Sequence, residues 1–181
     1  TDARRLRAVA SDHGLTISSL HWLLVKPDGL SISTPDAALH AHTVAFLTQL
    51  IGFAAACGAS VLVHGSPKQR SPQPGQSVAD ALARSEAAWA QLAAPAAQHG
   101  VTYCIEALSP AETPVLNTLA EAAAVVDRIG SPSLRTLFDL SAAAQSEREP
   151  PHAVLQRFLA SGHVAHVQLN DRNRRGPGQG D

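Results

Sequence analysis

Short apolar runs alternate along the chain with longer segments in which apolar residues recur at helical spacing. The longest such segment covers residues 35–57, and residues 77–80 and 118–121 have the spacing of helix capping boxes. Glycines at 14, 58, 100, 130 and 162 follow the periodic segments and mark their ends. The pattern predicts helices over 1–13, 35–57, 77–99, 118–129 and 151–160. It predicts strands over 15–24, 60–65, 103–106, 134–140 and 163–170.

The order of these elements predicts an α/β fold. Strands that are separated by helices imply right-handed crossovers and a parallel sheet. Each predicted strand also closes on, or carries near its end, a polar side chain that can bind a metal or move a proton: His21, His64, Glu106, Asp139 and Gln168. Polar groups at successive strand ends are typical of the catalytic rim of a (β/α)8 TIM barrel.

Composition favours a single soluble globular domain over residues 1–181, with 45% hydrophobic and 16% charged residues. A net charge of −1 and a pI near 6.7 argue against a nucleic-acid-binding surface. Cys57 and Cys104 both lie in apolar segments, which favours reduced, buried thiols in a cytoplasmic protein. No apolar run approaches the roughly 18 residues that span a bilayer, and no signal peptide is recognisable, so we expect no membrane partner.

Two carboxylates follow one another where the predicted strand 103–106 leaves the sheet. Glu106 ends the strand and Glu112 lies in the Pro-containing loop after it. Carboxylate and amide oxygens of Glu106, Asp139 and Gln168 suit Mg²⁺ or Mn²⁺, whereas imidazole from His21 or His64 would admit softer metals. The alternative for each histidine is an interior ring that only hydrogen-bonds to a backbone carbonyl.

Basic side chains occur in the loop over residues 65–77 and near the C-terminus. Lys68, Arg70, Arg174 and Arg175 could hold a phosphate group or could form a solvated rim. A loop of this length in a compact domain is usually a functional lid or a mobile linker.

Several motifs together resemble the xylose isomerase-like TIM barrel family. They are His21-Trp22, residues 63–66 (VHGS), residues 104–106 (CIE), residues 138–140 (FDL), and residues 166–171 (HVQLND) through 176–178 (GPG). This family includes sugar and sugar-phosphate isomerases and epimerases of the D-tagatose 3-epimerase and hydroxypyruvate isomerase types. The resemblance covers essentially the whole chain. It implies an incomplete portion of a (β/α)8 barrel, with about five strands and without the first two and the eighth.

The resemblance also implies roles for individual residues. Glu106 matches a carboxylate that is both metal ligand and acid/base, and Asp139 matches a second metal ligand. Glu112 and Arg174 match substrate-binding residues, and His21 and His64 match residues that line the sugar site. Two positions depart from the family: Gln168 replaces a metal-binding His, and Ala142 replaces a substrate-contacting His. The family's second catalytic Glu lies on the eighth strand, which this sequence does not include.

The function expected from these observations is that of a metal-dependent sugar or sugar-phosphate isomerase or epimerase. It would act through an enediolate formed by Glu-mediated proton transfer, with Mn²⁺ or Mg²⁺ favoured over Co²⁺ or Zn²⁺. Its partner would be a small sugar rather than nucleic acid or membrane, and a homo-oligomer is compatible with the sequence. Two alternatives stay open: a non-catalytic sugar-binding barrel, and an AP-endonuclease-like member of the same superfamily. Binding of a divalent cation separates the enzyme from the non-catalytic barrel, and the near-neutral pI argues against the endonuclease.

Overall fold

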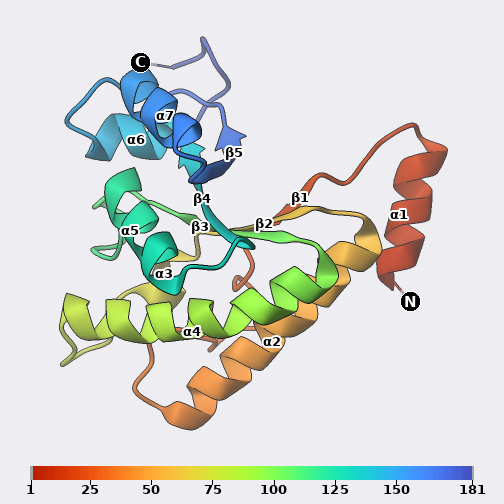
Figure 1. Cartoon of the computed structure of the whole chain (residues 1–181), viewed down its shortest axis with the longest axis horizontal. Helices are drawn as coiled ribbons and strands as arrows, with labels where there is room; N and C mark the ends of the chain where they lie inside the picture. The colour runs from red at the N-terminus through yellow and green to blue at the C-terminus, as the bar shows by residue number, and fades with distance from the viewer. Residues whose placement is uncertain (1, 181) are drawn as a thin grey trace.

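The computed structural model describes residues 2–180, so Thr1 and Asp181, the ends of the predicted first helix and last loop, lie outside the described residues. Its five strands form one parallel sheet in chain order (Figure 1). They are β1 (Ser19–His21), β2 (Val61–His64), β3 (Thr102–Glu106), β4 (Leu134–Asp139) and β5 (Val164–Gln168). In the part of the chain described here, β1 pairs only with β2 and β5 only with β4. The predicted parallel α/β sheet of five strands is therefore confirmed.

Seven helices connect or flank the described strands. They are α1 (Asp2–Asp12), α2 (Ala37–Cys57), α3 (Pro67–Arg70), α4 (Val78–His99), α5 (Leu119–Ile129), α6 (Leu140–Ser146) and α7 (Pro151–Ala160). The sequence pattern predicted neither α3 nor α6. Both are too short to show a hydrophobic period, and α6 begins directly after β4, where a loop was expected.

The predicted helix caps are present. Ser77 with Asp80, and Thr118 with Glu121, each form a capping box at the start of α4 and α5. At the other end of α4, Gly100 has a φ of 64°, a left-handed conformation that glycine adopts without a Cβ penalty. These local signals explain why the long helices were predicted nearly to their ends.

The main core lies between the sheet and the helices that cover its outer face. Leu62, Tyr103 and Ile105 point outward from β2 and β3 into a cluster with α2 and α4, which lie side by side (Figure 1). A second cluster joins Phe138 of β4 to α5, α6 and α7. The opposite, inner face carries a small apolar group of Val63, Cys104 and Leu137. Cys57 and Cys104 are free and buried, as predicted.

Helix α2 differs from the expectation that no segment is long and apolar enough to span a bilayer. It has 21 residues and passes that test on length and composition alone. One face of α2 nevertheless packs into the main core through Val44, Leu47, Ile51 and Ala54. The apolar character of that face is thus accounted for by its place against the sheet and α4.

The outermost strands are shorter than predicted. Ladder pairing begins at Ser19 with Val61, so residues 15–18 precede β1 rather than belong to it.

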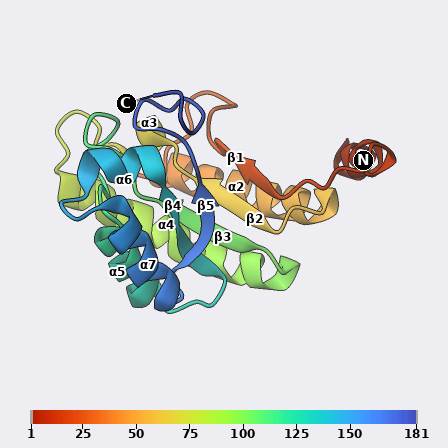
Figure 2. The same ribbon diagram turned by 90° about the horizontal axis from the view of Figure 1, so that it is seen from above.

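The register between β4 and β5 shifts by one residue: Thr136 pairs with Val164, whereas Leu137 pairs with His166. Val167 and Leu169, in and just after β5, are exposed. The loops after β1, β2 and β5 gather at one edge of the sheet (Figure 2).

Candidate active site

Strand alternation carries two carboxylates to the inner face at the carboxyl end of the sheet. Successive side chains of a strand point to opposite faces, so Glu106 shares the face of Cys104, and Asp139 shares that of Leu137. Both carboxylates lie one layer above the inner apolar group, and both residues are 2% exposed. This is the end of a parallel sheet at which α/β enzymes place their functional groups.

The Glu106 carboxylate is buried, and among the described residues it forms no close ion pair with a lysine or an arginine. Its side chain is 3% exposed, and its one recorded contact with a basic group is His21 Nε2, 3.7 Å from Oε2. Among the described residues, no hydrogen-bond donor reaches either carboxylate oxygen. Gly65 lies against it, and a Cβ atom at that position would overlap Glu106 Oε2. The fold therefore makes room for this carboxylate without satisfying it.

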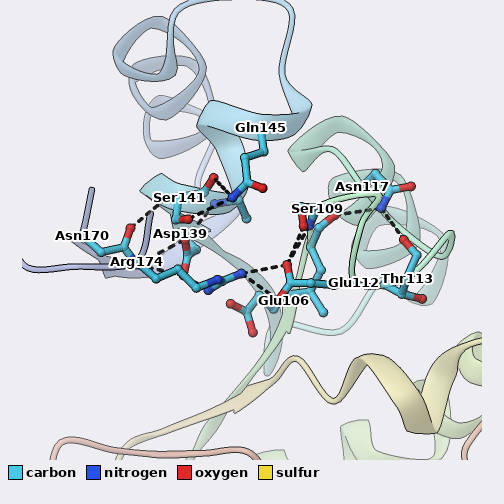
Figure 3. A network of polar contacts seen from close by, with 12 residues as sticks. Glu106, Ser109, Glu112, Thr113, Asn117, Asp139, Ser141, Gln145, Asn170 and Arg174 are labelled. Atoms are coloured by element: carbon cyan, nitrogen blue, oxygen red, sulfur yellow. Dashed lines mark hydrogen bonds and ion pairs between the residues drawn. The ribbon is translucent and has the colours of Figure 1, made fainter. Parts of the chain in front are cut away.

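Glu112 turns back over the site from the loop between β3 and α5. The Ser109 backbone N–H and hydroxyl both donate to Glu112 Oε2, at 3.1 and 2.8 Å. Arg174 Nη2 donates to both carboxylate oxygens at 2.8 and 2.7 Å (Figure 3). Glu112 thus faces the site and joins the loop after β3 to the loop after β5.

Asp139 is held by three donors. The Ala142 N–H at the start of α6 donates to Oδ1 at 2.9 Å, and the Asn170 amide lies 3.3 Å from Oδ2. Arg174 Nη1 is 3.5 Å from Oδ2, so this arginine bridges Asp139 and Glu112 (Figure 3). Gln168 is the register partner of Asp139 on β5 and is half-buried.

The donors present suit a hard divalent cation. Within residues 2–180, no group of three or more His, Cys, Asp or Glu side chains is arranged to hold a metal. The metal ligands that the sequence predicted are two carboxylates and one amide, those of Glu106, Asp139 and Gln168. Oxygen donors of this kind are those that Mg²⁺ and Mn²⁺ prefer, and the unsatisfied, buried Glu106 carboxylate is a group that a cation would neutralise. By the chemistry of their donor atoms, these residues fit a divalent cation.

A cavity of about 620 Å³ opens above Glu106. Its walls include His21, Glu106, Glu112 and Arg174 of the predicted site residues, together with Trp22, Lys68 and the 65–69 turn. Polar groups thus converge from the ends of β1 and β3 and from the loops after β2, β3 and β5. The volume lies within the range of small-molecule sites, roughly 300–1,000 Å³.

The predicted role of His64 in substrate binding is wrong. His64 is fully buried on the outer face of the sheet, where its Nδ1 accepts from Trp89 Nε1 at 3.2 Å and lies 2.6 Å from the Tyr103 hydroxyl. Burial, and then the nearby Arg70 cation, lower the pKa of His64 to about 3. His64 is the last residue of its strand, as predicted. Gly65, the next residue, is the one that lies on the inner face, against Glu106.

Histidines do line the inner face elsewhere. His21 reaches the cavity from β1, and His166 of β5 is half-buried on the same side as Glu106. Burial lowers the pKa of His166, the nearby His21 adds to this, and Glu106 opposes it. The three side chains are therefore close enough to influence one another's charge.

Arg70 was expected in a phosphate site or on a solvated rim, but it is fully buried and does not line the cavity. Its Nη1 donates to the Glu106 carbonyl oxygen at 2.6 Å. Burial lowers the pKa of Arg70 to about 10, opposed by Glu106 and then by Glu112, so the guanidinium is charged near neutral pH. The sequence pattern predicts neither this contact nor the contact of Asn170 with Asp139, because both join residues that are far apart in the chain.

Comparison with known proteins agrees with this geometry. The sequence profile of the family described as "Xylose isomerase-like TIM barrel" matches residues 1–181. A "Probable ketose 3-epimerase" from Synechocystis sp. (strain PCC 6803) is 25% identical over 98% of this chain and 60% of its own length.

Two solved structures show the same fold. A D-psicose 3-epimerase, crystallised in the presence of D-fructose, superposes with a TM-score of 0.85 at 24% identity, over 99% of this chain and 61% of its own. An L-ribulose 3-epimerase superposes with a TM-score of 0.80 at 26% identity, over 100% of this chain and 59% of its own. The chain thus spans about three fifths of the length of these relatives, and its five strands are an incomplete barrel, as predicted. The chain belongs to the xylose isomerase-like TIM barrel family.

Proposed function

We propose that this protein is a metal-dependent sugar epimerase or isomerase that moves a proton at a carbon next to the carbonyl of a ketose. One observation carries the proposal: Glu106 presents a buried, unsatisfied carboxylate at the floor of a cavity of about 620 Å³. A carboxylate that faces a cavity and accepts no hydrogen bond from the described residues is available to take a proton from a bound substrate. The relatives named ketose, psicose and ribulose 3-epimerases support the same class of reaction.

The residues of the candidate site have distinct parts in the proposed reaction. Glu106 removes the proton from the carbon beside the carbonyl, which leaves an enediolate, and the return of a proton to the opposite face of that carbon completes the epimerisation. Glu112 and Arg174 bind sugar hydroxyls, since both line the cavity and present a carboxylate and a guanidinium side by side. His21 lies at the mouth, within 3.7 Å of Glu106, and contacts the sugar from the side of β1.

Glu106, Asp139 and Gln168 would hold the divalent cation, with Mg²⁺ or Mn²⁺ favoured by their oxygen donors. When bound, the cation supplies Lewis-acid stabilisation of negative charge that develops on the sugar oxygens. In the structure Arg174 lies against Asp139 as well as Glu112, so it has to release part of this contact when the site is filled.

The substrate is a small sugar or sugar phosphate. Lys68 lines the cavity and gives it a cationic side chain for a phosphorylated sugar. The near-neutral charge of the chain continues to disfavour the endonuclease alternative.

The test is turnover of a panel of free and phosphorylated ketoses by the full-length protein in D₂O with Mn²⁺, followed by NMR. We expect epimerised product that carries deuterium at the reacting carbon. Glu106→Gln should lower kcat by about 10³-fold or more, because the amide cannot take the proton. Glu86→Gln, on the outer surface of α4 where Glu86 pairs with Arg128, is the matched control and should leave kcat unchanged.

Two outcomes would contradict the proposal. One is sugar binding without divalent cation or turnover, which would establish the non-catalytic barrel instead. The other is epimerisation that survives in Glu106→Gln, which would remove Glu106 as the base.

A further inference from the structure

We propose that Arg70 is a positioning residue for Glu106, whose guanidinium fixes the end of β3 so that the carboxylate faces the reacting carbon. The nature of the reaction rests on the proposed function, whereas the positioning itself rests on the contacts of Arg70. Arg70 does not line the cavity, so it acts through Glu106 rather than on the sugar.

The direct contact joins two elements at the point where the carboxylate leaves the sheet. Arg70 is the last residue of α3, and its Nη1 donates to the Glu106 carbonyl oxygen at 2.6 Å. Glu106 is the last residue of β3, beyond which the chain turns into the loop that carries Glu112. A charged donor on this carbonyl therefore restrains the backbone from which the Glu106 side chain extends.

The other two nitrogen atoms of the Arg70 guanidinium, Nε and Nη2, donate to no comparable acceptor among residues 2–180. The side chain of Arg70 is fully buried. None of the ion pairs recorded for these residues includes Arg70. A buried charge without a paired counter-ion opposes folding, and an apolar side chain of similar volume is often as stable or more stable. Stability of the fold alone thus does not account for an arginine at this position.

The charge of Arg70 is nevertheless felt by two carboxylates of the candidate site. Glu106 and Glu112 both favour the charged guanidinium, although no ion pair joins either side chain to it among the described residues. Both of these carboxylates line the cavity, whereas Arg70 does not.

The same turn contains one further feature that serves Glu106 and one residue in a strained conformation. Gly65 leaves the space that the Glu106 carboxylate occupies, since any Cβ atom there would overlap it. Ser66 has a φ of 44°, a left-handed conformation that is unfavourable for a residue with a side chain. Residues 65, 66 and 70 therefore all depart from what local stability prefers, and residues 65 and 70 do so in contact with Glu106.

The experiment compares Arg70→Met, Arg70→Lys and wild type in the full-length protein. Arg70→Met removes the charge and the donor at similar volume. We expect kcat to fall about 10- to 100-fold with KM changed less than about threefold, because a displaced base slows proton transfer more than it weakens binding. We expect the thermal midpoint of Arg70→Met to equal or exceed that of wild type. Arg70→Lys keeps the charge and one donor and should recover most of kcat.

Arg135→Met is the matched control. Arg135 is a partly buried arginine that donates to the Ser131 and Leu134 carbonyls near the start of β4, far along the strand from Asp139. It should leave kcat unchanged. Unchanged kcat in Arg70→Met would overturn the proposal. So would a loss of activity that tracks a lowered thermal midpoint and is not recovered by lysine, since that indicates a purely structural role.

A crystal structure of Arg70→Met separates this proposal from the proposed function. If wild type turns over no ketose, the proposed function fails, and the position of Glu106 alone decides the inference. A carboxylate displaced from its wild-type position supports the role of Arg70. A carboxylate that superposes on the wild type overturns it.

Discussion

His64 and Gly65 are neighbours in sequence, yet one faces the helices and the other faces the site. His64 packs against Trp89 and Tyr103 in the outer core, whereas Gly65 lies against the Glu106 carboxylate. The sequence pattern correctly predicted where the strand ends but not which of two adjacent residues points inward. Side chains along a strand alternate between its two faces, so an error of one residue in the assumed register reverses the face assigned to every side chain.

The buried His64 should make the fold sensitive to mild acid. Its pKa of about 3 is far below the ordinary 6.5, so the folded state keeps the ring neutral while the unfolded chain takes up a proton. Stability is therefore lost as pH falls from about 6.5 towards 3, and this ring alone should cost on the order of 2 kcal/mol between pH 7 and pH 5.

Urea denaturation of wild type and His64→Gln at both pH values checks this expectation. Glutamine can still accept from Trp89 but does not titrate in this range, so the loss of stability on acidification should be smaller in the variant. An equal loss in both proteins would show that His64 is not responsible.

At the scale of elements, α6 begins where the candidate site ends. Asp139 is the last residue of β4 and the N-cap of α6, since its Oδ1 accepts the Ala142 N–H at 2.9 Å. The carboxylate predicted as a metal ligand therefore also starts a helix. That second role could not be predicted from the sequence, because α6 is only 7 residues long and shows no hydrophobic period. The long helices α2, α4 and α5, by contrast, were predictable from their caps and periodicity.

The two roles of Asp139 can be separated by substitution. Asparagine caps helices about as well as aspartate, so Asp139→Asn should keep stability within about 0.5 kcal/mol of wild type, whereas Asp139→Ala should lose about 1 kcal/mol. Both variants should bind Mn²⁺ at least about tenfold more weakly, because a charged oxygen ligand is lost. Urea denaturation and calorimetric titration with MnCl₂ measure the two effects. Equal destabilisation by Asn and Ala would contradict the capping role.

At the scale of the whole molecule, the sheet is open on both sides in the described residues. β1 and β5 each pair on one side only, and large apolar side chains are exposed near both, among them Trp22 at 66% and Leu169 at 66%. The order and direction of all five strands followed from the alternation of elements in the sequence. The placement of Arg70, Arg174 and Asn170 around the carboxylates did not, because it depends on contacts between loops that are far apart in the chain.

Open edges of this kind promote association between copies. We expect the 181-residue chain, prepared by itself, to self-associate at micromolar concentration, as measured by size-exclusion chromatography with light scattering. Leu169→Lys should shift it towards smaller species, because a charge beside β5 opposes edge pairing. Leu159→Lys, at an exposed position on α7, is the control and should not. A monomeric wild-type chain would contradict the expectation.

The match between strand order and chain order has a consequence for biosynthesis. Among the strands of residues 2–180, each strand from β2 onward pairs with the strand made immediately before it, and none inserts between two earlier ones. A chain emerging from the ribosome can therefore add one strand and helix at a time to a sheet already in place, because domains form from the N-terminus during translation. Glu106, the proposed proton-transfer group, is therefore synthesised before Asp139 and Gln168, the residues proposed to complete its metal site.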